Sequence, residues 1–339
     1  MATVDYNLRD NDKFYYVEGS TTVNNMISTI AKELTVNPPT TYRWKLEFPA
    51  NADDIENKII LSTITTFNKK FYLQVARGKA DANNVLPITY VNMNIGTSLN
   101  ETKDGLVEGE VSPTTKLSWY KESIDSSIKG WLPVSYWINV TKDAVNMVFR
   151  GDPSADNNPY TKFLISYAYI GSLSKLDSEQ EDDVDYNFGI TTSSSTEPEY
   201  TNMYGPRTGT GVTDFCMIAN RIGLPYQPHY TGFYSTNPFM DKFNIEGSRW
   251  NHSKHQFDKV TIVHPVDMER GYLQNVLSGD GSALDDNSKL VYKEKTKEQQ
   301  MYKKFQITAP FSLINNSANV KHCVAIRCYN PDEVIKVEE

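Results

Sequence analysis

The sequence predicts a mainly β protein: an antiparallel β-sandwich or barrel-like core with one early amphipathic helix and long loops. Three observations carry this prediction. Many short segments alternate apolar and polar residues, turn residues separate them at short intervals, and one segment has a helical period. Aromatic residues make up 12% of the 339 residues, and 21 of them are Tyr. This content favours half-exposed strands over disorder, which is poor in aromatic residues.

The predicted helix covers residues 21–35. Its apolar residues recur with a period of 3.6 and form one stripe, which is typical of a helix that packs on a core. Ser20, Thr21 or Thr22 can cap its start, and the two prolines at 38–39 prevent it from continuing. The stripe consists of Val23, Met26, Ile27, Ile30 and Leu34.

After the prolines the period changes to two. Residues 43–48 alternate charged with large apolar residues, which predicts a strand with one face in water. The same alternation occurs at 70–75, 136–140 and 145–149. Residues 163–170 are instead apolar at successive positions, so we expect a central strand that is covered on both faces.

Turn residues separate these segments at 68–69, 80–84, 103–105 and 151–153. Many short strands with regular turns indicate an antiparallel sandwich or barrel rather than a parallel α/β fold. No repeat of 20–50 residues is apparent, so a propeller or solenoid is not expected.

Composition divides the chain into a β-rich domain at 1–175, an acidic and Ser/Thr-rich linker or long loop at 176–200, and a second β-rich, loop-rich region at 201–339. The third part either stands alone or belongs to the first domain. We expect the linker to be exposed, because it has few apolar residues to offset the entropy of ordering. A calcium loop that starts at Asp177 would need a ligand at its twelfth position, where Phe188 stands.

The last part of the chain has a weaker pattern. Glycine, proline and aromatic residues at 204–239 predict loops. Strands are predicted at 259–263 and 322–328, and short helices at 270–277 and 295–302.

No motif in this part predicts a cofactor, a metal ion or catalysis. The glycine-rich residues 205–211 lack the Lys of a phosphate-binding loop. His252 and His255 lie in a polar, turn-like segment, and with His229 and His264 they do not match a zinc signature.

Cys216 and His229 could in principle form a thiol–imidazole pair. Cys216 lies in an apolar run, however, which is more typical of a small core residue. The chain has three cysteines, and Cys323 and Cys328 should lie on opposite faces of one strand. We therefore expect no disulfide and synthesis in a reducing cytoplasm.

Charge and hydropathy argue against two classes of partner. The net charge is −8 and no basic stripe is visible, whereas nucleic-acid binding depends on contacts from basic residues to phosphates. The longest apolar stretches are shorter than the roughly 20 residues that a membrane helix needs. We expect neither nucleic acid as a partner nor insertion into a membrane.

An aromatic segment at 226–234 contains Pro and Gly and predicts a loop that packs against another chain. The candidate residues for this subunit contact are Tyr226, Tyr230, Phe233 and Tyr234.

Residues 136–143, 148–153 and 160–171 carry a resemblance to a known class of proteins. They read as a strand, a Gly-Asp-Pro turn, a polar insert and an aromatic strand that ends in Gly. This region resembles structural proteins of tailed bacteriophages, particularly large phages of Gram-positive bacteria, including tail, collar, baseplate and capsid accessory proteins.

The resemblance implies a non-enzymatic virion component that is made in the host bacterial cytoplasm. Its partners would be other virion proteins and copies of itself, joined through strand edges and aromatic loops. No site residues are carried over from the resemblance. Two alternatives remain open: a carbohydrate-binding surface module with exposed Trp and Tyr platforms, and a hydrolase without a recognisable motif.

Overall fold

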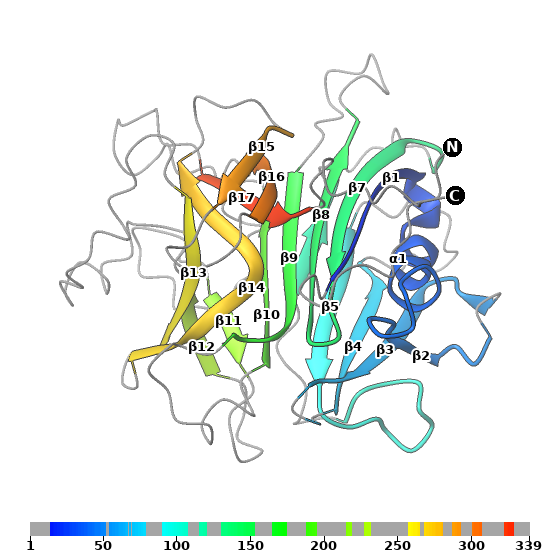
Figure 1. Ribbon diagram of the computed structural model, residues 1–339. Coiled ribbons are helices and arrows are strands. Elements are labelled where there is room, and N and C mark those ends of the chain that lie inside the picture. The colour runs from blue at the N-terminus through cyan, green and yellow to red at the C-terminus, as the bar shows by residue number, and fades with distance from the viewer. Residues whose placement is uncertain are drawn as a thin grey trace, which may run out of the picture.

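The computed structural model describes residues 14–51, 54–66, 68, 70–78, 90–107, 115–120, 130–152, 165–174, 188–194, 215–218, 227–231, 257–264, 268–280, 287–292, 300–306 and 322–328. Every strand pair among them is antiparallel, and the α-helix lies early in the chain. The predicted fold class is therefore confirmed (Figure 1). No helix in the described part of the chain is long and apolar enough to cross a bilayer.

The predicted helix at 21–35 forms as a short 3-10 turn, η1 (Val23–Asn25), followed by α1 (Met26–Thr35). The apolar stripe faces the core, and all five of its residues are buried. The first amides of a helix lack partners within the helix itself. Here Val23 N donates to Leu132 O at 2.9 Å and Asn24 N donates to Gly130 O at 3.0 Å, so a distant segment caps the helix.

The smaller of two sheets has five strands in the order β2-β3-β4-β5-β6. Each strand pairs with the next one along the chain, so the sheet is a simple meander. Its strands are β2 (Lys45–Phe48), β3 (Lys58–Ile64), β4 (Lys70–Arg77), β5 (Tyr90–Gly96) and β6 (Thr115–Ser118).

The larger sheet has twelve strands in the order β1-β7-β8-β9-β10-β11-β12-β13-β14-β17-β16-β15. Strands from both 1–175 and 201–339 belong to it. Its members are β1 (Tyr15–Thr22), β7 (Pro133–Val140), β8 (Ala144–Gly151), β9 (Ile165–Ser172), β10 (Phe188–Ser194), β11 (Phe215–Ile218), β12 (Gln227–Thr231), β13 (Phe257–His264), β14 (Met268–Asp280), β15 (Lys289–Tyr292), β16 (Gln300–Gln306) and β17 (His322–Arg327).

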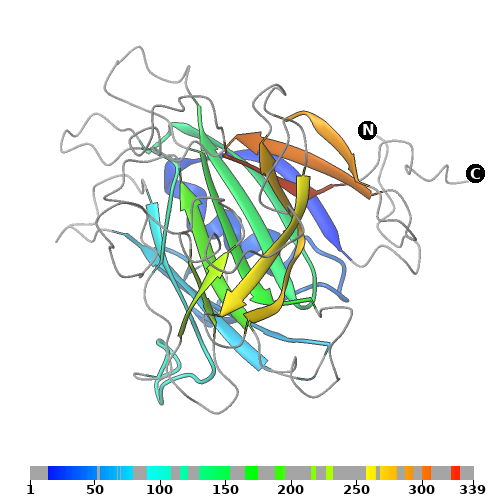
Figure 2. The same cartoon turned by 90° about the vertical axis from the view of Figure 1, so that its left-hand side faces the viewer.

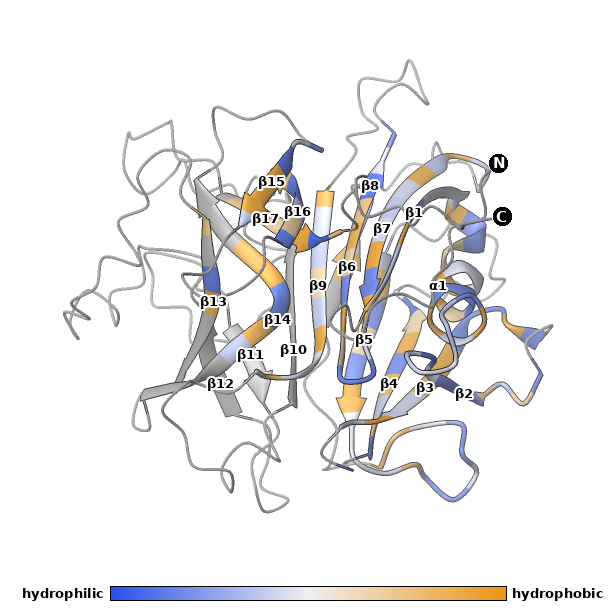
Figure 3. Ribbon diagram, viewed as in Figure 1, coloured by the Kyte–Doolittle hydropathy of each residue, from blue (hydrophilic) through white to orange (hydrophobic). Residues whose placement is uncertain are grey.

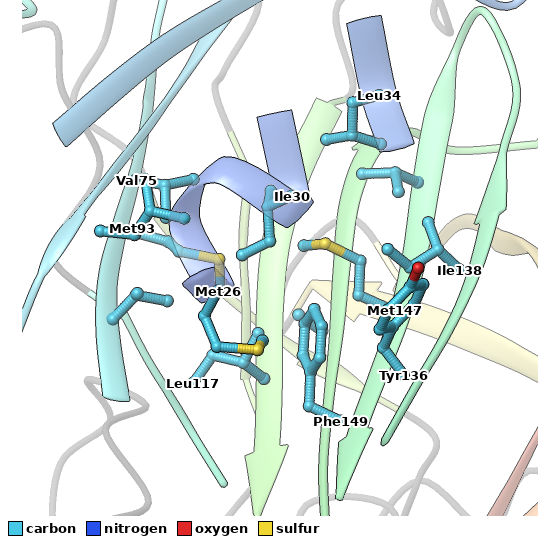
Figure 4. Close-up of a cluster of buried hydrophobic side chains, with 14 of the residues drawn as sticks. Met26, Ile30, Leu34, Val75, Met93, Leu117, Tyr136, Ile138, Met147 and Phe149 are labelled. Carbon is cyan, nitrogen blue, oxygen red and sulfur yellow. The ribbon is translucent and has the colours of Figure 1, made fainter. Parts of the chain in front are cut away.

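Strands β1, β7, β8 and β9 form the middle of three layers. On one side they pack against α1 and the small sheet, through residues such as Met26, Met93 and Phe149 (Figure 4). On the other side they pack against β13, β14, β16 and β17, because the large sheet curls back over itself (Figure 2). Burial on both sides explains why the described residues of this segment, 165–170, carry apolar side chains on both faces.

The curl is closed by a short bridge. Just after β9, Ser174 N donates to Tyr272 O at 2.8 Å, and Tyr272 N donates to Ser174 O at 3.0 Å. Strands β9 to β14 therefore return upon themselves in a barrel-like turn, and we call the inner face of this turn the concave face. In Figure 3, β14 carries both hydrophobic and hydrophilic residues, without a regular alternation along the strand.

The linker predicted at 176–200 is wrong for residues 188–194, which form β10. The strand pairs along its whole length with β9, from Phe188 opposite Ser172 to Ser194 opposite Ser166. Backbone pairing needs no apolar side chain, and β-branched Thr suits a strand. Composition alone therefore mistook a sheet strand for a loop.

The structure also contradicts the helix predicted at 270–277 and the described end, 300–302, of the helix predicted at 295–302. Residues 270–277 lie in β14, and the last three residues of the segment 295–302 lie in β16. β14 is bulged, with register shifts opposite Lys259–Thr261 and Ile262–Val263. A bulge interrupts the period of two, so the apolar spacing resembled that of a helix.

Candidate functional site

The edges of the two sheets are the candidate interaction surfaces, and two of the four, β6 and β2, are covered or blunted. β6, one edge of the small sheet, lies against β9 and β10 of the large sheet. The Ser166 hydroxyl on β9 hydrogen-bonds to Ser118 O on β6. This edge is therefore covered by the molecule itself.

β2, the other edge of the small sheet, is blunted by charge and by a bulge between Leu46 and Phe48. Glu47 accepts from Lys45 at 2.8 Å and from Lys70 at 3.0 Å. Burial raises the pKa of Glu47, but its hydrogen-bond donors and Lys70 outweigh burial and lower the pKa to about 2. A charged, bulged edge disfavours pairing with another strand.

β1, at one end of the large sheet, meets β16 through a polar cluster around Glu18. The Glu18 carboxylate accepts from Tyr16 OH at 3.1 Å, from Trp137 Nε1 at 3.1 Å and from the Lys303 ammonium of β16. Partial burial raises the pKa of Glu18, but Lys303, Tyr16 and Trp137 outweigh it, so the net shift is downward. Below the carboxylate, the Trp137 and Phe305 rings pack with centroids 4.8 Å apart.

β15 forms the opposite end of the large sheet, and no strand in the described part of the chain pairs with its outer edge. Lys304 N donates to Ser288 O at 2.9 Å, and Leu290 lies opposite Tyr302 in the same register. Because hydrogen-bonded pairs alternate along an antiparallel ladder, Leu290 bonds to β16. The backbone N–H and C=O groups of Lys289 and Val291 then face away from β16.

The open edge lacks most of the features that prevent strand addition. The β15–β16 pairing has no bulge, the strand has no proline, and Val291 is 61% exposed. Lys289 is the only charged residue in it. Unpaired backbone groups next to an exposed β-branched residue form a template for another strand.

Of the four aromatic residues predicted to make a subunit contact, only Tyr230 lies in a described segment. It belongs to β12, opposite Phe215 of β11 and Val263 of β13. The central part of the predicted loop is thus a strand. Tyr226, Phe233 and Tyr234 lie outside the described residues, so the contact stays a prediction.

The structure does bring together Cys216 and His229, which lie directly opposite each other on β11 and β12. His264 is the last residue of β13, the next strand. The sequence analysis considered the pair Cys216 and His229, but it could not place the two residues on paired strands because 204–239 were predicted as loops. His252 and His255, the glycine-rich 205–211 and the acidic 177–185 lie outside the described residues.

Among the residues whose side chains the structure describes, no three His, Cys, Asp or Glu lie close enough to share a metal ion. Cys323 and Cys328 are both buried. Burial raises the pKa of the Cys328 thiol to about 11. This thiol is therefore protonated at neutral pH and unreactive.

One aromatic platform is exposed. Trp131, which precedes β7, is 64% exposed and is the only Trp, Tyr or Phe among the large exposed residues of the described part of the chain. Its neighbour Gly130 accepts the hydrogen bond from Asn24 N. A side chain of this kind suits a sugar ring or a protein partner.

No protein-family model matches the chain, and no curated protein is significantly similar to it. The described residues of 136–171 form most of β7, β8 and β9 at the centre of the molecule. We therefore expect a functional site at the surface rather than among these core strands.

Proposed function

We propose that this protein is a non-enzymatic structural component of a tailed-phage virion, placed at the tail, collar or baseplate, where several copies assemble through β15. The observation that carries the proposal is the open edge of β15 with Val291 exposed. An assembly protein needs a surface of this kind, whereas a monomer gains stability and solubility by blunting it.

The occupant of this edge is the β15 strand of a second copy. A partner must offer a strand edge of its own, and β15 of a second copy offers such an edge with Val291 exposed on it. Antiparallel pairing of two β15 strands forms a closed two-fold contact. In the register that places Lys289 opposite Val291 of the other copy, no two lysines face each other, so like charges do not oppose the contact.

The contact is weak by itself. Four residues bury far less than the roughly 1,200 Å² of a stable interface. Pairing therefore depends on the high local concentration that a particle supplies, where several weak contacts act together. The protein is expected to be monomeric in dilute solution and to associate at high concentration.

The test uses two substitutions at one position. Val291→Pro removes an N–H that faces away from β16, so it blocks the added strand while the β15–β16 ladder remains. Val291→Thr keeps the N–H and the β-branched shape and serves as the matched control. Two lost donors at about 1 kcal/mol each should reduce incorporation into particles at least about tenfold for Val291→Pro.

Incorporation is measured by quantitative mass spectrometry of particles purified from phage that carry each variant. If the wild-type chain is present in particles and Val291→Pro is incorporated to the same extent, β15 is not the contact between copies. That result would not contradict the proposal that the protein is a virion component. Absence of the wild-type chain from purified particles would overturn the virion proposal itself.

A carbohydrate-binding surface module is the second candidate, and exposed Trp131 is the observation that favours it. An exposed indole can stack on a sugar ring. The same particle measurement separates the two functions when it is paired with a glycan-binding assay of the isolated chain. Two results together would favour the second function. The wild-type chain would be absent from purified particles, and its sugar binding would be lost in Trp131→Ala.

A further inference from the structure

Basic side chains gather where β15 and β16 meet β1. Lys289 of β15 lies directly opposite Lys303 of β16, so two positive charges occupy one cross-strand pair. Like charges in this position destabilise a sheet. The Lys303 ammonium contacts the Glu18 carboxylate of β1, which neutralises one of the two charges. Lys289 is exposed and forms no ion pair with any residue in the described part of the chain.

A third cation, Arg150 of β8, joins the group through Trp137. The Trp137 Nε1 donates to Glu18 at 3.1 Å, and the Arg150 guanidinium lies 5.3 Å from the Trp137 ring centroid. Among the described residues, Arg150 has no ion pair either. We call Lys289, Lys303 and Arg150 the basic cluster. Its three cations contact a single described carboxylate, although the net charge of the chain is −8.

The buried Cys328 thiol lies among the same charges. Burial is the main cause of its raised pKa, while Lys303 and Lys289 act to lower that pKa and Glu18 acts to raise it. Both lysines are therefore close enough to Cys328 to influence one thiol. The Glu18 side chain is 51% exposed, and Lys289 is exposed as well. The basic cluster thus borders on solvent and carries a surplus of positive charge that a partner can neutralise.

We propose that the basic cluster docks the acidic residues 177–185 of a second copy of this chain. Six of these nine residues are Asp or Glu and none is basic, so the two surfaces have complementary charge. Lysine and arginine form charge-assisted hydrogen bonds with carboxylates. The docking rests on the proposed assembly of several copies. It is continuous with the β15 contact, because Lys289 belongs to β15, and it adds affinity to that weak pairing.

The first test measures self-association of the full chain by sedimentation equilibrium at low salt. Arg150→Glu and Lys289→Glu should each weaken association at least about threefold, and the double variant Asp182→Lys/Asp183→Lys at least about tenfold, because repulsion replaces attraction. Lys32→Glu is the matched control. It changes the net charge by the same amount at an exposed position of α1 and should associate like the wild-type chain.

Mixing two variants identifies the copy to which the acidic residues bind. In a mixture of Arg150→Glu with Asp182→Lys/Asp183→Lys, the unchanged acidic run of one chain meets the unchanged basic cluster of the other. The mixture should therefore associate more tightly than either variant alone. An acidic run that docks on its own chain gives no such recovery, and that result would overturn the proposal. Thermal melts check that each variant is folded.

The second test does not depend on β15. A fluorescein-labelled peptide of residues 177–185 is titrated with the full chain and followed by fluorescence anisotropy. We expect binding at low salt that is weaker in Arg150→Glu and Lys289→Glu. Binding should be lost at high salt, because the Debye length falls from about 10 Å at 0.1 M to about 3 Å at 1 M. A peptide with Asn and Gln in place of Asp and Glu should not bind.

Equal peptide affinity in the wild-type chain and both cluster variants would overturn the docking. So would a wild-type chain that binds a DNA fragment but not the peptide, because its basic cluster would then serve phosphates. Weaker association of Val291→Pro with unchanged association of the charge variants would reject the docking and leave the β15 contact in place. Peptide binding and charge-dependent association by a chain that is absent from particles would reject the virion function alone.

Discussion

The two faces of the strands β7, β8 and β9 are packed in different ways. The face toward α1 and the small sheet is mostly apolar and includes ring contacts, although Tyr136 OH donates to the buried Glu33 of α1 at 3.0 Å. The Trp119 and Phe149 rings meet at 5.9 Å, and Trp44 meets Phe71 edge-on at 5.5 Å. Apolar contacts of this kind have little directionality, so they contribute stability without selecting one register.

The opposite face, toward β14 and β17, contains a buried polar network. Asn146 Nδ2 donates to Gln274 O at 2.8 Å, and its Oδ1 accepts from Tyr167 OH at 2.7 Å. Asn139 Nδ2 donates to Arg327 O at 3.1 Å, and its Oδ1 accepts from Asn275 at 3.2 Å.

This difference shows how the layer of β7, β8 and β9 can pack against α1 and the small sheet on one face and against β14 and β17 on the other. Asn139 and Asn146 are partners in the β7–β8 register, and both are buried. They reach Gln274 and Asn275 in the bulged part of β14, where Asn275 has a φ of +58°. A bulge leaves backbone groups without ladder partners, and the amides satisfy them. The polar face therefore selects the position of β14, while the apolar face holds the layer together.

Phe149→Ala should have the largest effect, because it opens a cavity on the apolar face. We expect a loss of about 3–5 kcal/mol in the free energy of unfolding, measured by urea denaturation. Met147→Leu on the same face keeps the volume and should cost less than about 1.5 kcal/mol. Equal losses in the two variants would contradict tight packing at this face.

Asn146→Leu should have an intermediate effect. It leaves the Gln274 carbonyl without its donor and Tyr167 without its acceptor, which costs about 1–3 kcal/mol in the free energy of unfolding. Faster amide hydrogen exchange in β14 than in β3 and β4 would show that the loss is local to the polar face. An unchanged β14 exchange rate would mean that the network does not position this strand.

Glu18→Gln should have the smallest effect, roughly 0–1 kcal/mol, since the Glu18 side chain is 51% exposed and water screens its pairing with Lys303. The pKa of Glu18 is lower in the folded protein than in the unfolded chain. Its contribution is therefore present above the ordinary pKa of about 4.5, and it is lost as the pH falls through the lower, folded value. Thermal melts of both proteins from pH 7 to pH 3 should converge at the acidic end, and a constant difference would contradict this role.

Local pattern was sufficient for much of the N-terminal half. The stripe from Val23 to Leu34 predicted α1, and the alternation at 70–75, 136–140 and 145–149 predicted β4, β7 and β8. The helical period and the strand alternation both arise because one face of the element is buried. Each can be recognised from residues that are only a few positions apart in the sequence.

By itself, then, the sequence determined the antiparallel β class, the early helix and the strands with regular alternation. Tertiary structure alone decided that polar residues 188–194 form β10, that 270–277 belong to a bulged strand, and that β15 has an open edge. It also decided that Cys216 lies opposite His229. The physical reason is that each of these features depends on which strand lies alongside, and backbone hydrogen bonds to a distant segment can stabilise a strand whose own residues carry no period.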